Sequence, residues 1–131
     1  MLGDQDDEER EGCSMQAGKI CYLEIPATDV DVSASFYVKL FGWKLRVRGD
    51  GSRAFDDATG AVSGSWVIGR PPARDPGILP YVMVEDIDRT LEQARELGGE
   101  TVTPRMALGP GDSFAILRDP AGNLVGIYQA P

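Results

Sequence analysis

The sequence predicts an α+β domain made of two copies of one β-α-β-β-β module. Segments Ile20–Trp43 and Leu79–Gly99 each contain a strand pattern, an acidic turn and a helix pattern that stops at glycine. Each segment is followed by further stretches with strand-like alternation of apolar and polar residues. The chain has 131 residues and is 42% hydrophobic, which suits one domain with its own core.

The first module is predicted to occupy residues 19–70. Its first strand is expected at Lys19–Ile25, and Asp29 or Asp31 caps the following helix, which Gly42 ends. Three strand patterns follow, separated by turns: "WKLRVRG", "RAFDD" and "AVSGSWVIG".

The second module is predicted to occupy residues 78–129, after a proline-rich and charged linker at residues 71–77. It starts with a strand at Ile78–Val84 and a helix at Asp86–Leu97. The patterns "ETVTP", "SFAILRD" and "NLVGIYQ" predict three more strands, and "DPAGN" predicts a tight turn before the last of them.

Two offsets align the modules with each other. An offset of 57 positions places Tyr22 on Leu79 and aligns the opening strands and helices without a gap. An offset of 62 positions places Gly64 on Gly126 and aligns the closing strands. This internal repeat is stronger evidence for the fold than any single motif.

Charge and composition restrict the classes of partner. The net charge is −8, and residues 1–18 hold six acidic residues and one basic residue, so they are predicted to form a solvated acidic tail before the domain at residues 19–131. Because the patterned sequence begins only at Lys19, Met15 is an alternative start. The chain shows no basic patch, membrane-span pattern or secretory signal, so we expect a cytoplasmic protein that binds neither nucleic acid nor membrane.

Histidine is absent, and the two cysteines, Cys13 and Cys21, lack CxxC spacing. These facts argue against a zinc site, exclude a histidine-dependent nucleophilic triad and favour a reducing compartment.

Three runs carry a family resemblance: "EIPATDVDVSASFYVKLFGW", "LPYVMVEDIDRTLEQARELGG" and "FAILRDPAGNLVGIYQ". Together they resemble the vicinal oxygen chelate superfamily, which includes glyoxalase I, bleomycin-resistance proteins and extradiol dioxygenases. The resemblance covers roughly residues 19–129. It implies that the two modules form a curled mixed sheet around a concave cleft, with the helices on the convex side. It also implies a homodimer, because single-domain members commonly pair.

In metal-dependent members of this superfamily, the first and last strands of each module supply the metal ligands. The resemblance places those positions at Tyr22, Gly64, Leu79 and Gly126. Leucine and glycine side chains have no donor atom and a neutral tyrosine is a poor ligand for divalent ions. We therefore expect no metal and no other cofactor.

Strand parity predicts which side chains share the concave face with those positions. The expected binding residues are aromatic, apolar or small, with one carboxylate: Tyr22, Glu24, Gly64, Trp66, Leu79, Tyr81, Met83, Gly126 and Tyr128. The two glycines are expected to leave room for a ligand. The alternative is that the aromatic residues fill the interior or a dimer interface, and that Arg46 or Arg48 neutralises Glu24 in a structural ion pair.

These residues favour a metal-free protein that binds or sequesters an aromatic or cationic small molecule. One alternative is a metal-independent enzyme with Glu24 as its general base and Tyr22, Tyr81 or Tyr128 as hydrogen-bond donors. Another is a lyase-type or dioxygenase-type activity, which rests on family analogy alone.

Overall fold

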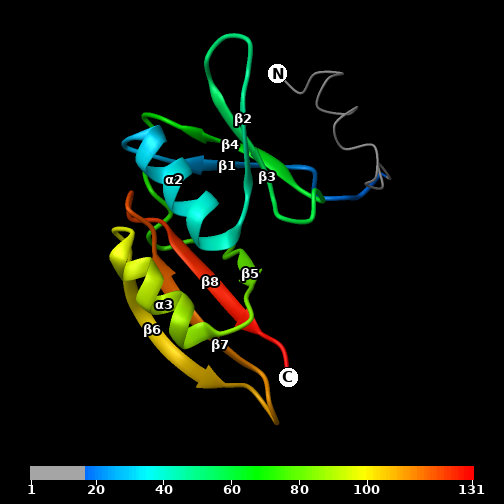
Figure 1. The fold of residues 1–131 in the computed structure, drawn as a ribbon, viewed down its shortest axis with the longest axis vertical. Helices are drawn as coiled ribbons and strands as arrows, with labels where there is room; N and C mark the ends of the chain where they lie inside the picture. Colours follow the sequence, from blue (N-terminus) through cyan, green and yellow to red (C-terminus); the bar gives the residue numbers. More distant parts are fainter. Residues whose placement is uncertain (1–16) are drawn as a thin grey trace.

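The computed structural model describes residues 17–131, and the predictions for the acidic tail, Cys13 and Met15 concern residues 1–16, outside this range. The described chain contains two helices and eight strands (Figure 1): β1 (Tyr22–Pro26), α2 (Val30–Phe41), β2 (Lys44–Val47), β3 (Arg53–Asp56), β4 (Ser63–Val67), β5 (Tyr81–Met83), α3 (Ile87–Glu96), β6 (Glu100–Ala107), β7 (Ser113–Arg118) and β8 (Leu124–Gln129).

The strands form two separate four-stranded mixed sheets. Their orders are β1-β4-β3-β2 and β5-β8-β7-β6, so each sheet repeats the same topology. The first strand of each module runs parallel to the last, and the other pairs are antiparallel. Helix α2 lies against the first sheet and α3 against the second (Figure 1). The predicted α+β fold of two β-α-β-β-β modules is therefore confirmed, and β1 and β5 are both edge strands.

Both helices begin and end where their capping residues predict. Asp29 caps α2, because its Oδ1 accepts a hydrogen bond from the backbone N–H of Val32 at 3.3 Å, while Asp31 lies in the first turn. Gly42 ends α2 in the left-handed conformation with φ 72°. Asp86 caps α3 in the same way as Asp29 caps α2.

One apolar core extends through both modules. From the first module, Tyr37, Trp43 and Phe55 are buried, and the Trp43 ring stacks between the other two at centroid distances of 4.8 and 4.5 Å. The second module adds Ile87, Leu91, Leu117, Val125 and Ile127 to the same cluster. The aromatic residues of the "FY" and "GW" runs are therefore core residues.

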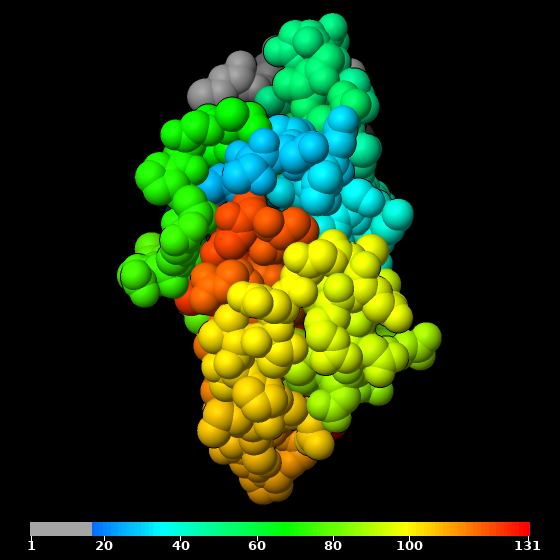
Figure 2. Space-filling view, turned by 90° about the vertical axis from the view of Figure 1, so that its left-hand side faces the viewer, coloured from blue at the N-terminus to red at the C-terminus, as the bar shows by residue number. Residues whose placement is uncertain are grey.

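A buried polar network joins the modules at the turn between β7 and β8. The Tyr37 hydroxyl donates to Asp119 Oδ2 at 2.8 Å, and Asn123 Nδ2 donates to the Pro26 carbonyl at 2.7 Å. Asn123 Oδ1 also accepts from the Ala73 N–H in the linker at 2.8 Å. Figure 2 shows this orange segment against the blue and cyan surface of the first module. The neighbouring Pro and Gly indicated only a turn residue at Asp119, but its carboxylate also binds Tyr37 of α2.

Within the described range, neither helix is long and apolar enough to cross a bilayer.

Candidate functional site

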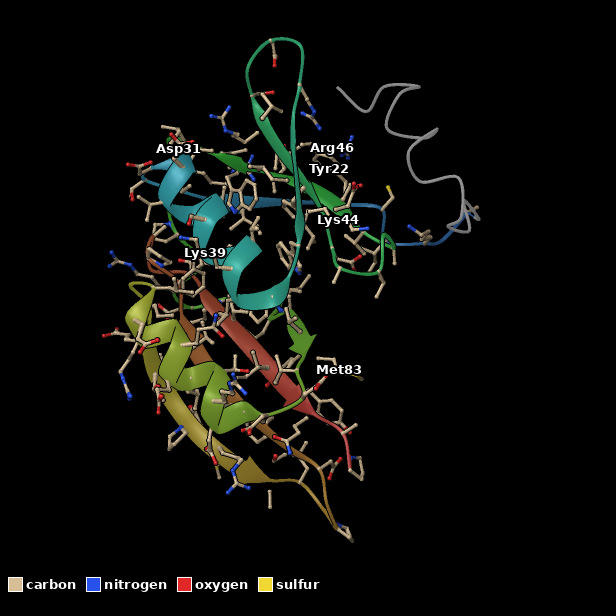
Figure 3. All side chains as sticks on the ribbon, viewed as in Figure 1. Tyr22, Asp31, Lys39, Lys44, Arg46 and Met83 are labelled. Atoms are coloured by element: carbon tan, nitrogen blue, oxygen red, sulfur yellow. The ribbon has the colours of Figure 1, made fainter. Side chains whose placement is uncertain are left out.

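The face of the first sheet that points away from α2 is polar. Strand pairing places Tyr22 opposite Ser63 and Glu24 opposite Ser65, and Asp56 continues the same face on β3. Lys44 and Arg46 extend this face onto β2, as their pairing with Asp56 and Ala54 requires. Figure 3 shows Tyr22, Lys44 and Arg46 gathered on the first sheet.

The structure corrects the expected neighbours of Tyr22 and Glu24 on this sheet. Gly64 pairs with Leu23 and Trp66 with Ile25, so both lie on the opposite, core-facing side. Trp66 is buried against Tyr37 and Phe55. Pairing of the closing strands gives an offset of 61 positions, Ser65 to Gly126, because Glu24 pairs with Ser65 just as Tyr81 pairs with Gly126. The expected offset of 62 positions was wrong by one residue, which moves a side chain to the other face of a strand.

On the second sheet, four of the expected residues share one face. Tyr81 pairs with Gly126 and Met83 with Tyr128, so these four residues share the face that points away from α3, and Leu79 lies two residues before β5 begins. Phe114 lies opposite Tyr128 on the same face and contacts Tyr81 edge-on, with ring centroids 6.3 Å apart. This face is apolar and partly open, with Met83 69% exposed.

The two glycines do not create empty space, contrary to expectation. A Cβ atom added at Gly126 would lie 2.5 Å from the ring of Tyr81, and one added at Gly64 would overlap the ring of Phe55 and the carbonyl oxygen of Leu23. Each glycine therefore lets an aromatic ring lie directly across its strand.

Glu24 has an ion-pair partner that the sequence did not indicate. Arg70 Nη2 lies 2.8 Å from Glu24 Oε1, and both side chains are about half exposed, at 51% and 46%. Arg46 instead pairs with Asp56 at 3.0 Å, and Arg48 donates to the Tyr22 hydroxyl at 2.8 Å. The proposed structural partners of Glu24 are thus engaged elsewhere.

Tyr128 also has a carboxylate partner. Its hydroxyl donates to Asp112 Oδ2 at 3.0 Å, in the loop between β6 and β7. This hydrogen bond, followed by desolvation and the negative charge of Asp112, raises the pKa of Tyr128. The glycine-rich loop "LGPGDS" therefore orients a tyrosine of the open face.

A cavity of about 480 Å³ lies between the modules, bordered by the edge strands β1 and β5. Its walls are mainly apolar and include Leu23, Ile25, Phe41, Trp43, Phe55 and Val82. Polar groups come from Glu24, Asp57, Thr59 and Asn123, and no lysine or arginine of the described chain lines it. Of the nine expected binding residues, Glu24, Tyr81 and Met83 border this cavity. Its size is in the usual range for small-molecule sites.

Trp66 borders a second, more polar cavity of about 430 Å³ beside the start of α2. Arg48, Arg53, Ser65 and Asp31 also line it, and Arg53 Nε lies 3.4 Å from Asp31 Oδ1. The positive charges of Arg48 and Arg53 are balanced by the negative charges of Asp29 and Asp31, which line the same cavity.

The residues present do not fit the metal centre that the resemblance implies. With the corrected register, the four positions are Tyr22, Ser65, Leu79 and Gly126, of which only the first two carry oxygen atoms on their side chains. Among residues 17–131, no group of three or more histidine, cysteine, aspartate or glutamate side chains is arranged to hold a metal ion. Divalent ions prefer such donors.

Comparison with known proteins identifies the family. Residues 19–127 match the Glyoxalase/Bleomycin resistance protein/Dioxygenase superfamily, so the chain belongs to this superfamily. A glyoxylase-like domain-containing protein of Didymella fabae is 30% identical over 122 residues, which cover 87% of this chain and 95% of the relative.

Two further similarities concern a longer relative and a solved structure. The anthracycline biosynthesis protein DnrV of Streptomyces peucetius is 29% identical over 130 residues, covering 86% of this chain and 47% of DnrV. The chain spans less than half the length of this relative and of two mycobacterial relatives at 26% identity. A family enzyme from Burkholderia phytofirmans has the same fold, with a TM-score of 0.71 at 18% identity over 87% of this chain and all of that one.

Proposed function

We propose that the chain is a metal-independent, small-molecule-binding member of the superfamily. Its ligand has a flat apolar body that lies in the cavity between the modules and a positively charged group that lies near Glu24 and Asp57. The observation that carries this proposal is the lining of the cavity, which combines apolar walls with two carboxylates and, among residues 17–131, no basic side chain. Such a site offers apolar area for affinity and a few polar groups for orientation.

The electrostatics favour a cation over an anion. Glu24 already pairs with Arg70, but both side chains are about half exposed, so the pair is screened and weak. A ligand cation is thus able to compete with Arg70 for the Glu24 carboxylate. The aromatic walls favour the same type of ligand, because a cation is attracted to the face of an aromatic ring.

The experiment uses two ligands of the same shape, naphthylmethylamine and naphthylmethanol, titrated by calorimetry. We expect Glu24→Gln to weaken binding of the amine by about fivefold and to leave the alcohol unchanged, since a screened ion pair contributes up to about 1 kcal/mol. We expect Arg70→Gln to strengthen amine binding, because it removes the competing cation. The matched control is Glu92→Gln, on the exposed surface of α3 and away from the cavity. Equal effects of Glu24→Gln on both ligands, or binding of neither, would contradict the proposal.

We also propose that the protein forms a homodimer. The open face of the second sheet leaves large apolar side chains exposed, including Met83 at 69% and Met106 at 50%. Contiguous apolar surface of this kind is typical of an interaction site. Light scattering on the full chain measures the oligomeric state directly, and a monomer at working concentrations would reject this part of the proposal.

One observation favours the enzymatic alternative. Glu24 and Tyr22 share a face, and the Tyr22 hydroxyl accepts from Arg48, which leaves its own proton available to a ligand. In this alternative Glu24 is the general base and Tyr22 the hydrogen-bond donor. Glu24→Gln would then abolish turnover while leaving binding of a neutral ligand intact.

A further inference from the structure

The cavity between the modules has a polar component that side chains do not supply. It is bordered by β1 and β5, and within residues 17–131 each of these strands pairs with another strand on one side only. An edge strand presents a row of backbone N–H and C=O groups without a strand partner. The hydrogen bonds on the paired side of each strand show which residues have N–H and C=O groups that point to the unpaired side.

On β1 the odd-numbered residues bond to β4. The carbonyl of Cys21 accepts from the Ser63 N–H at 3.3 Å, and the Ala27 N–H donates to the Val67 carbonyl at 2.8 Å. Because backbone groups alternate in direction along a strand, those of Glu24 point away from β4. The Pro26 carbonyl, which has the same parity, confirms this direction, since it accepts from Asn123 of the other module.

On β5 the even-numbered residues bond to β8. The Val84 N–H donates to the Tyr128 carbonyl at 2.8 Å, and the Pro80 carbonyl accepts from the Gly126 N–H at 2.9 Å. The N–H and C=O groups of Tyr81 and Met83 therefore point away from β8. Glu24, Tyr81 and Met83 all border the cavity.

We propose that the ligand of this cavity also carries secondary amides in an extended, peptide-like segment, which pairs with the backbone edges of β1 and β5. This inference rests on the proposed function, because it concerns the same cavity. A secondary amide carries one donor and one acceptor in the geometry that a strand edge recognises. The apolar walls accommodate the side chains of such a compound, while the edges bind its amides and give specificity that a flat hydrocarbon cannot use.

The first test compares two ligands on the unmodified protein. The probe is N-acetyl-leucyl-phenylalanine methylamide, and the control is the same compound with every amide nitrogen methylated, which removes its donors. We expect the control to bind about tenfold more weakly, since each net hydrogen bond contributes roughly two- to tenfold in affinity. Equal affinity of the two compounds would overturn the proposal.

The second test removes one edge donor from the protein. Met83→Pro deletes an N–H that points away from β8, at a residue that borders the cavity, and no bond of the β5–β8 ladder, which is where proline is tolerated in a sheet. Met83→Ala is the matched control, because it shortens the side chain and keeps the N–H. We expect the probe to bind Met83→Pro about fivefold more weakly than Met83→Ala, and the methylated compound to bind both equally.

The outcomes separate this inference from the proposed function. If naphthylmethylamine binds and neither peptide compound does, the peptide inference is wrong and the binding function stands. If no compound binds, both fail. Thermal unfolding of both Met83 variants verifies that they are folded. If Met83→Pro is unfolded, the comparison of the two peptide compounds on the unmodified protein decides whether the ligand pairs through its amides.

Discussion

At the scale of single residues, Gly64 and Gly126 illustrate what a repeat in the sequence does and does not reveal. The two glycines align by identity, yet strand pairing matches Gly126 with Ser65. Side chains alternate between the faces of a strand, so this one-residue difference moves Gly64 and Trp66 from the open face to the core. The number of residues in the turn between β3 and β4 fixes the register, and no pattern in the sequence encodes it. On the second sheet the same parity argument succeeded.

The different surroundings of the two glycines predict different costs for adding one methyl group. At Gly64 the new Cβ would overlap a backbone carbonyl and the fully buried Phe55 ring, neither of which can move away. We expect Gly64→Ala to lower the free energy of unfolding by about 2–3 kcal/mol. At Gly126 the obstacle is the ring of Tyr81, which is half exposed and able to rotate outwards. We expect Gly126→Ala to cost less than about 1 kcal/mol, as measured by urea unfolding, and a larger cost than that of Gly64→Ala would contradict this interpretation.

At the scale of elements, capping residues predicted the helices closely, whereas partners distant in sequence set the extent of the strands. Asp29, Asp86 and Gly42 mark helix ends because their side chains or backbone freedom act locally. The strand expected at Ile78–Val84 is shorter in the structure, where β5 contains only Tyr81–Met83. In contrast, β6 extends beyond "ETVTP" to Ala107. The ion pair of Glu24 with Arg70, the residue just before the linker, joins residues 46 positions apart, and no local pattern predicts such a contact.

The contact between α2 and the β7–β8 turn predicts a dependence of stability on pH. Burial, followed by the charge and hydrogen bond of Asp119, raises the pKa of Tyr37 well above its ordinary value. A group with a raised pKa in the folded state contributes stability below its unfolded pKa of about 10, and this contribution is lost as pH rises further. We expect the free energy of unfolding to fall above pH of about 10, by up to about 1.4 kcal/mol per pH unit from this group.

The matched variant is Tyr37→Phe, which keeps the ring and removes the ionisable hydroxyl. We expect it to cost about 1 kcal/mol at neutral pH through loss of the bond to Asp119, and to unfold with a smaller dependence on alkaline pH than the unmodified protein. Urea midpoints measured at neutral pH and above pH of about 10 test both statements. Parallel alkaline losses in the two proteins would show that Tyr37 is not the group responsible.

At the scale of the whole molecule, the two sheets are separate but the core is shared. Phe36 and Tyr37 belong to the same apolar cluster as Leu117 and Ile127 of the other module. A polar network centred on Asn123 adds hydrogen bonds from the second module to β1 and to the linker. The cavity lies beside this shared core, between β1 and β5, and residues of both modules line it. Ligand binding and the packing of the modules against each other therefore depend on the same region.

This arrangement predicts that residues 17–131 unfold in one cooperative transition and that Asn123 stabilises all of it. In Asn123→Ala the Pro26 carbonyl and the Ala73 N–H both lose their hydrogen-bond partner. We therefore expect the free energy of unfolding to fall by about 2–4 kcal/mol. Asp57→Ala is the comparison, because the Asp57 side chain also accepts several hydrogen bonds, and these come from nearby Thr59 and Ala61. We expect that variant to cost about 1 kcal/mol.

Calorimetry shows whether the two modules unfold together or separately. A single transition whose midpoint falls further in Asn123→Ala than in Asp57→Ala is expected, because the side-chain bonds of Asn123 join segments 50 and 97 positions apart, whereas the side-chain bonds of Asp57 reach no further than four positions. If the modules were independent, Asn123→Ala would instead separate the unfolding into two transitions. The cavity would then lie between two bodies free to move, and its apolar walls would open without unfolding of either sheet.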